Sequence, residues 1–497
     1  MWVALAVLFV AILAVLAYLD TRKPKGFPPG PRWYPLVGSA PQVKKARIRT
    51  GSLYEATAEM SKEYGAVIGL KVGKDPLVVV YGPQQIKEFG MSEDLIGRPY
   101  GSYFKLRTWG KRRGILLTDE AFWQEQKRFL LRQLREFGFG TKTMSSLIED
   151  EVEHFVDYVG KCITKSGSEI TVNMESFFSI SILNTLWKMM AGIRYSHEDE
   201  NLKRLQEILS TLFQTIHMVG AAFSHFPILK HIAPELSGYK CYVDTHERIW
   251  EFLHDEIQQH KKTHSPGDPR DLMDIYLDML NQPACPDSFS EEQLLAICMD
   301  MFMAGSETTN NTLSFCFLYL ILNPDIQSKA REEIDSVLGD RMPSLEDRSK
   351  MPYMECIVLE SLRMFAARAF SVPHRAVKDT YLGGYFIPKD VLVTANLHGC
   401  MMSAEAGFKN PDQFIPERFL KDGAVSVPEN FYPFGLGKRR CMGEYLARAN
   451  IFLFATSLLQ KFEFHVVPRF PPDMKIVDGV TPAPLHYQAT IVFRQND

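Results

Sequence analysis

A glycine-rich loop that carries one cysteine and leads into an apolar helix constrains this chain more than any other segment. The loop spans residues 434–443 and reads FGLGKRRCMG, with Cys441 near its end. Its three glycines remove Cβ atoms that would keep the backbone away from a flat ligand. The apolar periodicity of residues 444–462 predicts a helix, so we expect Cys441 beside a helix N-terminus. There the helix dipole and the two preceding arginines favour a thiolate.

An isolated cysteine in a tight turn would more commonly be a buried free thiol. Here the glycines, Phe434 and Arg439 fall in register with Cys441, and the segment resembles the haem-thiolate loop of the cytochrome P-450 family. The resemblance implies that Cys441 is the axial ligand of a haem b iron. Such a ligand donates electron density that favours O–O cleavage. The resemblance also places Phe434 and Gly435 against the haem.

The composition limits the class of protein. The chain has 497 residues, 46% hydrophobic, with 33 Phe, which is enough for a large core and an apolar cavity. The net charge of −3 gives no indication of nucleic-acid binding. The eight cysteines lack the paired spacing of a zinc site and the density of a disulfide scaffold. We therefore expect a reducing, cytosol-facing domain.

The N-terminus predicts a single membrane span. Residues 2–19 are an uncharged run of 18 residues, which as a helix would reach about 27 Å. Basic residues follow the run and none precedes it, so the positive-inside rule keeps the remainder in the cytosol. A cleaved secretory signal is the alternative, but the long apolar run without a basic start argues against it.

These signals divide the chain into three parts. Residues 1–20 are the expected membrane anchor, and residues 21–35 are a basic, proline-rich hinge that contains the sequence FPPGP. No strong linker divides residues 36–497, so we expect one large haem-binding catalytic domain. Apolar spacings of three and four dominate residues 120–365. The fold class is therefore mainly α with small β-sheets (α+β), as in the cytochrome P-450 fold.

Three further sequence patterns predict the positions of strands and of one long helix. Residues 66–72 and 77–81 predict strands around a turn at 74–76, and residues 380–396 return to strand character. Ser290 and Gln293 form an expected capping box that opens a helix running to Asn323. At 33 residues that helix would be about 50 Å long, enough to cross a domain.

The long predicted helix contains the sequence AGSET, from Ala304 to Thr308. Thr308 resembles the proton-delivering threonine of the family, and Glu307 resembles its acidic neighbour. Oxygen activation requires two protons in an apolar pocket, and a hydroxyl and a carboxylate can relay them. Alone, these residues would more commonly be helix positions with internal hydroxyl hydrogen bonds.

Glu360 and Arg363 match the Glu-x-x-Arg motif of the family, and Arg418 resembles the arginine that completes its buried ion network. A Glu and an Arg three residues apart are usually a surface pair of little energetic consequence. If they are buried, loss of one partner would leave an uncompensated charge. We assign these three residues to architecture.

The two haem propionates require cationic and hydrogen-bonding partners. By resemblance these are Arg98, Trp123, Lys127 or Arg128, His374 and Arg439. The family usually has Arg at the fourth residue after Trp123, whereas this chain has Lys127, a point charge in place of a planar fork. Read singly, each cation would more commonly be a solvated surface residue.

Basic residues also surround the cysteine loop, as a solvated face or as a dock for an acidic electron donor. The family resemblance implies NADPH-cytochrome P-450 reductase as that donor and the endoplasmic reticulum membrane as the location. A mitochondrial ferredoxin is less favoured because the N-terminus is not an Arg-rich amphipathic presequence. The segments at 97–99 and 137–140 resemble those of animal microsomal members, with an insect-like character.

The expected substrate pocket is apolar, which suits a lipophilic ligand. Its candidate residues, by position relative to the motifs, are Phe104, Phe302, Ala304, Phe370, Val372 and Val480. Apolar residues of this kind are also what any core contains. Residues 226–229 are a candidate membrane-facing entrance.

The resemblance implies a monooxygenase that inserts one atom of O₂ into a lipophilic substrate by hydroxylation or epoxidation. An insect hormone precursor such as a sesquiterpenoid ester is one possible substrate, and broad xenobiotic metabolism is the alternative. A reductase-independent haem-thiolate isomerase is a second class, but such enzymes commonly lack the threonine that stands here at 308. A non-catalytic haem carrier is a third, and the complete Glu307–Thr308 pair disfavours it.

Overall fold

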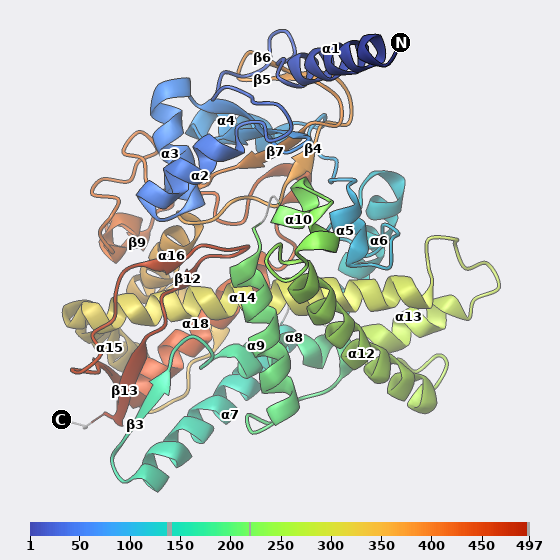
Figure 1. Ribbon diagram of the computed structural model, residues 1–497. Helices are drawn as coiled ribbons and strands as arrows, with labels where there is room; N and C mark the ends of the chain where they lie inside the picture. The colour runs from blue at the N-terminus through green and yellow to red at the C-terminus, as the bar shows by residue number, and fades with distance from the viewer. Residues whose placement is uncertain (137–141, 218–219, 495–497) are drawn as a thin grey trace.

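The computed structural model describes residues 1–136, 142–217 and 220–494, so the segment at 137–140 lies outside the described residues. Helix α14 (Glu291–Leu322) runs through the middle of the molecule and is buried along most of its length (Figure 1). The Ser290 hydroxyl accepts a hydrogen bond from the Gln293 N–H at 3.1 Å. The predicted start is therefore confirmed, and the helix ends at Leu322, with Asn323 as its C-cap.

Helices α8, α12, α16 and α18 contact α14 and with it form the main core. The described α-helices are α1 (Trp2–Asp20), α2 (Ala40–Thr50), α3 (Leu53–Tyr64), α4 (Pro83–Met91), α5 (Ser102–Leu106), α6 (Glu120–Glu136), α7 (Lys142–Ser166), α8 (Ser179–Ala191), α9 (Glu200–Thr215), α10 (Ala222–His225), α11 (Leu229–Ile232), α12 (Tyr239–Thr263), α13 (Leu272–Leu280), α14, α15 (Pro324–Leu338), α16 (Pro352–Ala366), α17 (His398–Met401) and α18 (Glu444–Lys461). The short 3₁₀ helices in the described part of the chain are η1 (Leu345–Lys350), η2 (Pro416–Phe419) and η3 (Gly437–Arg439).

The sheets are small and lie at the edges of the helical body (Figure 1). One has the strand order β1-β2-β7-β4, and another has the order β10-β13-β3. The strands are β1 (Val67–Val72), β2 (Asp75–Val80), β3 (Glu169–Asn173), β4 (His374–Arg375), β5 (Thr380–Leu382), β6 (Tyr385–Ile387), β7 (Leu392–Ala395), β8 (Leu420–Lys421), β9 (Ala424–Val425), β10 (Phe462–Val466), β11 (Ile476–Val477), β12 (Ala483–Pro484) and β13 (Gln488–Phe493). The architecture is the predicted mainly α fold with small sheets.

The turn of the first hairpin differs from the prediction. Val72 pairs with Asp75, so the turn consists of Gly73 and Lys74, and the predicted turn at 74–76 is wrong. Gly73 has φ +59°, a backbone conformation that a two-residue hairpin turn requires and that glycine adopts without strain. The glycine was a better signal for this turn than the proline that follows it.

Helix α1 is long and apolar enough to cross a membrane, and none of its residues is buried in the core. Its C-terminal end is tied to the first sheet. The carboxylate of Asp20 forms an ion pair with buried Lys71 and accepts a hydrogen bond from the Leu36 N–H at 2.8 Å. The expected anchor therefore joins the globular part through a specific polar contact.

Candidate active site

The cysteine loop is a closed turn that precedes α18. The Cys441 N–H donates to the Phe434 carbonyl at 3.0 Å, and the Gly435 N–H donates to the Tyr432 carbonyl at 3.1 Å. Gly435 has φ +71°, and no atom outside its neighbours lies within 4 Å of where its Cβ would be. This glycine thus leaves open space beside the loop, of the kind that a flat ligand can occupy.

The Cys441 thiol is exposed, yet the surrounding protein is dense enough that burial raises its pKa. A thiol with both properties borders an internal space. Hydrogen bonds from the Gly443 and Glu444 N–H groups and the charge of Arg440 oppose this rise in pKa but are outweighed. The expected thiolate-favouring environment is therefore only partly present, because Arg440 is engaged by Glu444 at 2.6 and 2.8 Å. A metal cation would supply the missing positive charge.

Arg98 and His374 are buried side by side near the strand pair that brings residues 97 and 375 together. Arg98 Nη1 donates to the carbonyls of Val372 and Pro373 at 3.2 and 3.0 Å. Its Nε has no hydrogen-bond partner among the described residues. His374 Nδ1 lies 2.7 Å from the Leu95 carbonyl, so Nε2 is left for another partner.

Arg439 joins the same group from the cysteine loop. Its guanidinium lies 3.6 Å from the ring centroid of Trp123, and it donates to the carbonyls of Ile96 and Thr118 at 3.0 and 2.9 Å. The structure thus brings together residues from positions 98, 123, 374 and 439, which the family resemblance had selected.

The charges of this group are unbalanced. Burial lowers the pKa of Arg98 and His374 well below their usual values and that of Arg439 to about 10, and the charge of Arg439 further lowers the pKa of Arg98 and of His374. The nearby carboxylate, Asp119, is already bound by other donors. Because buried cations without counterions are costly, the site fits an anionic ligand such as the two propionates of haem.

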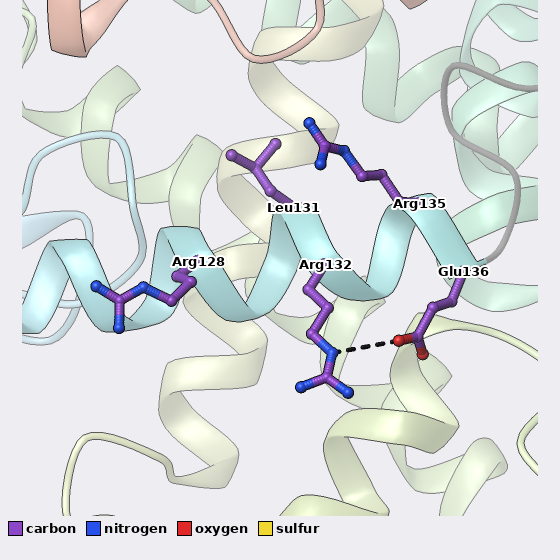
Figure 2. A pocket seen from close by; sticks show the side chains of 5 residues that line it. All are labelled: Arg128, Leu131, Arg132, Arg135 and Glu136. Carbon is purple, nitrogen blue, oxygen red and sulfur yellow. Dashed lines mark hydrogen bonds and ion pairs between the residues drawn. The ribbon is translucent and has the colours of Figure 1, made fainter.

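The side chains of Lys127 and Arg128 lie in different surroundings in the structure. Lys127 Nζ donates to the Lys438 carbonyl at 2.7 Å and lies 4.7 Å from the Trp123 ring centroid. Arg128 lines a different, outward-facing pocket on α6, together with Arg132 and Arg135 (Figure 2). Of the two alternatives, the structure places Lys127 with the cationic group and Arg128 away from it.

Helix α14 borders an internal space over one short stretch. Ala304 is exposed and Thr308 is partly exposed, although the helix around them is core. The Thr308 hydroxyl donates to the Ala304 carbonyl at 2.9 Å. The adjacent Gly305 lies against α8. A Cβ on it would come within 2.4 Å of Leu186 Cδ2, so it permits close packing of α8.

Glu307 stands three residues after Ala304 in α14 and is buried. Its carboxylate contacts Asn311 Nδ2 at 3.5 Å and the hydroxyl of Ser210 on α9. Burial raises the pKa of Glu307 to about 7, against the lowering effect of these two hydrogen bonds. At neutral pH the carboxyl group is therefore poised to take up and release a proton.

The candidate pocket residues are not all placed alike. Phe104, Phe370, Val372 and Val480 are partly exposed. Phe302 is fully buried, with its ring centroid 5.7 Å from that of Trp187 and 5.8 Å from that of Phe252. The structure therefore places Phe302 in the core between helices, because it stands two residues from Ala304 and faces away from it.

Glu360, Arg363 and Arg418 form a compact buried network. Arg363 donates to both carboxylate oxygens of Glu360 at 2.8 Å, and Arg418 Nε donates to Glu360 Oε1 at 3.0 Å. The remaining Arg363 donors reach the carbonyls of Met401 and Gln413. The network joins α16 to the irregular segment before the cysteine loop.

Sequence reasoning missed Asp119, which organises the cationic group. It accepts from the Arg98 N–H at 2.7 Å, from Arg375 at 3.0 Å and from Arg112 at 2.6 Å. Burial would raise the pKa of Asp119, but these donors lower it to about 2. The available signal in the sequence was Arg375, which donates to Asp119 and directly follows His374.

Comparison with known proteins is decisive for the family. A sequence model of the family described as cytochrome P450 matches residues 28–490. The chain belongs to the cytochrome P450 family. Members of this family bind haem through a cysteine axial ligand, and the protein is accordingly a haem-thiolate monooxygenase, an oxidoreductase that uses O₂.

Three relatives show how far the similarity extends. The chain is 43% identical over 496 residues to the probable cytochrome P450 303a1 of Drosophila melanogaster, covering 98% of each chain. It is 35% identical to the farnesoate epoxidase of Bombyx mori, covering 95% of this chain and 96% of the relative. It is 30% identical to cytochrome P450 2J5 of Mus musculus, covering 98% and 95%. The insect-like and animal character predicted from the motifs is confirmed.

Proposed function

We propose that Cys441 is the axial haem ligand of this P450 and that the enzyme oxygenates a lipophilic substrate with electrons from NADPH-cytochrome P-450 reductase. The observation that carries the proposal is the pair of guanidinium groups at Arg98 and Arg439, with neutral His374 beside them, next to the open space at Gly435. Bound there, haem supplies the iron that activates O₂.

The cationic group would hold the propionates. Arg98 offers its unpartnered Nε, and His374 offers its free Nε2. The Trp123 ring packs against the Arg439 guanidinium and supports it. Lys127 extends the group as a point charge that already spans α6 and the cysteine loop. Phe434 and Gly435 allow the loop backbone to approach the haem face.

Thr308 and Glu307 would handle protons. The Thr308 hydroxyl borders the internal space and can donate there by releasing the Ala304 carbonyl. Glu307 changes protonation state near neutral pH and stands next to Thr308 in α14. Thr308→Ala is expected to keep haem but divert reducing equivalents to peroxide or water. Unchanged coupling of NADPH use to product would contradict this role.

The substrate proposed is a sesquiterpenoid acid or ester, because a relative at 35% identity is named for epoxidation of farnesoate. The apolar candidates Phe104, Phe370 and Val480 suit such a chain. The test is incubation of the enzyme, reductase and NADPH under ¹⁸O₂ with farnesoic acid and with methyl farnesoate. A product carrying one ¹⁸O atom supports the proposal. Oxygenation of unrelated xenobiotics at higher kcat/KM would favour the broad alternative.

The basic face of α6 is the proposed dock for the reductase. Arg128, Arg132 and Arg135 point outward from one helix, and Arg132 is paired with Glu136 at 3.2 Å (Figure 2). Lys127 connects the same helix to the cysteine loop, so the proposed dock adjoins the loop that carries Cys441. Arg128→Glu with Arg135→Glu is expected to raise the KM for reductase at least tenfold at low salt. A salt-independent KM would count against this dock.

The endoplasmic reticulum membrane is the proposed location, with α1 as the single span and residues 36–497 in the cytosol. Ile228, Ile232 and Leu236, in and around α11, are exposed apolar side chains that can rest on the bilayer. Cell fractionation and protease protection test the location and the orientation.

A further inference from the structure

Glu307 is one end of a polar chain that reaches the protein surface. The carboxyl group of Glu307 contacts two side chains: Asn311, on its own helix, and Ser210, on α9. The Asn311 amide also faces the Thr481 hydroxyl and the Pro482 carbonyl at 3.4 and 3.3 Å. Of the two contacts of Glu307, only the Ser210 hydroxyl can both accept and release a proton.

The other end of the chain is an exposed histidine. The side chain of His486, between β12 and β13, is 57% exposed, and its Nδ1 lies 3.0 Å from Glu175 Oε2. Gln214 on α9 then links Glu175 to Ser210. Its Nε2 donates to Glu175 Oε1 at 2.8 Å and to the Ser210 hydroxyl at 3.2 Å. The contacts therefore run without a break from His486 to Glu307.

We propose that the protons used in oxygen activation enter at His486 and Glu175 and reach Glu307 through the Ser210 hydroxyl. This inference rests on the proposed function, because only an oxygenase consumes protons at α14. It assigns proton-transfer roles to Glu175 and Ser210.

Each transfer is a proton exchange between oxygens or nitrogens, without oxidation. His486 takes a proton from bulk water, and its Nδ1–H protonates the Glu175 carboxylate. A primary amide does not relay protons readily, so Gln214 positions the two flanking oxygens, and a bridging water carries the proton from Glu175 to Ser210. Ser210 accepts this proton on Oγ and releases its own to the Glu307 carboxylate. The route runs twice per O₂ when one oxygen leaves as water.

The position of Glu307 favours this direction. Its carboxyl group is buried, and its hydrogen-bonding neighbours are Asn311 and Ser210. Burial raises its pKa to about 7, which allows it to accept a proton from Ser210 and later to yield it.

The test is hydrogen–deuterium exchange of the Glu307 carboxyl proton, followed by time-resolved infrared spectroscopy after mixing the haem-loaded full-length enzyme into D₂O at pH 6. The carboxyl C=O band is assigned by its loss in Glu307→Gln. We expect Ser210→Ala and Glu175→Gln each to slow the exchange at least tenfold, because a positioned proton carrier typically contributes about 10²–10⁴-fold. Ser210→Thr, which retains the hydroxyl, is expected to restore the rate.

His465 provides a matched control for His486. It is also a surface histidine beside a glutamate, 53% exposed and 3.4 Å from Glu463. His486→Gln is expected to slow the exchange two- to threefold, and His465→Gln is expected to leave it unchanged. Wild-type exchange rates in both Ser210→Ala and Glu175→Gln would overturn the route and place proton entry on the Thr308 side. The carbon-monoxide spectrum tests haem ligation separately, so failure of the route and failure of the proposed function are distinguishable.

Discussion

Two buried arginine clusters in this P450 differ in whether the protein alone completes them. In the first, Glu360 binds Arg363 and Arg418, and backbone carbonyls take the remaining donors. In the second, Arg98, His374 and Arg439 face one another, and one guanidinium nitrogen has no partner among the described residues. The first cluster is satisfied without a ligand, whereas the second has more positive charge than its surroundings compensate.

The difference distinguishes residues that stabilise the fold from residues that bind a ligand. A completed network stabilises the junction that it bridges, and its loss costs stability directly. Burial and the charge of Arg439 both lower the pKa of Arg98, and an anion bound beside Arg98 would relieve this unfavourable state. The predictions below change one cluster at a time.

Replacing Glu360 should have the largest effect. Glu360→Gln leaves Arg363 and Arg418 buried without a counterion, and breaking a buried pair in this way costs about 3–5 kcal/mol. The free energy of unfolding from urea titrations measures this loss. Glu59→Gln, which removes the exposed partner of Arg49, is the matched control and should cost at most about 1 kcal/mol. Equal losses in the two variants would mean that the Glu360 network is not structural.

Replacing Arg98 should separate haem retention from stability. Arg98→Met removes a propionate partner and relieves repulsion with Arg439, so haem should dissociate at least tenfold faster while the urea midpoint of the haem-free protein does not fall. A charge-assisted hydrogen bond contributes about 1.5–3 kcal/mol, which sets this scale. Transfer of haem to apomyoglobin measures the rate. Wild-type retention of haem would contradict the assignment.

Lys127 and Arg128 provide a smaller, paired comparison. Lys127→Ala should accelerate haem loss a few-fold, because Lys127 spans α6 and the cysteine loop. Arg128→Ala should leave haem loss unchanged and lower only the reductase-supported rate, because Arg128 faces outward (Figure 2). The same transfer assay and a stopped-flow reduction assay measure the two effects. A reversal of the pattern would exchange the two roles.

The pH dependence of the free energy of unfolding tests the surroundings of the Glu360 cluster. His398 begins α17, the helix whose Met401 carbonyl binds Arg363. Burial, and then the charge of Arg368, lower the pKa of His398 from 6.5 to about 4. The unfolded chain therefore binds the proton first, and stability falls as pH decreases from about 6.5 towards 4. Between pH 7.5 and 5.5 the loss should be about 1.4 kcal/mol.

Urea titrations at the two pH values test this sign. In His398→Gln the loss should be smaller by that amount, because glutamine does not titrate. His465→Gln, at an exposed position, should behave as the wild type. A pH-dependent loss that is identical in His398→Gln and the wild type would show that His398 is not responsible.

Sequence motifs located both clusters but did not show whether the charges of each cluster are balanced. Glu360, Arg363 and Arg418 could be grouped from spacing and resemblance, and so could Arg98, His374 and Arg439. Whether their charges are balanced depends on carbonyls and carboxylates that tertiary structure brings in, such as Met401 and Asp119. Local sequence contains no record of these partners, because they stand 20 or more residues away.

The regular elements were predictable for a different reason. Helix α14 begins at a local cap and follows a local apolar pattern, so its limits could be read from residues 290–323. The hairpin turn and the orientation of Phe302 could not be read in this way. The first depends on the pairing register, and the second depends on which face of α14 borders the internal space and which faces pack against other helices.

The reduced, carbon-monoxide-bound absorption spectrum of the full-length enzyme tests the central claim most directly. The account predicts the strongly red-shifted Soret band that a trans thiolate produces, and its loss in Cys441→Ser while Arg440→Ala retains it. A band typical of histidine ligation, or a red-shifted band that persists in Cys441→Ser, would contradict the assignment of Cys441 as the haem ligand.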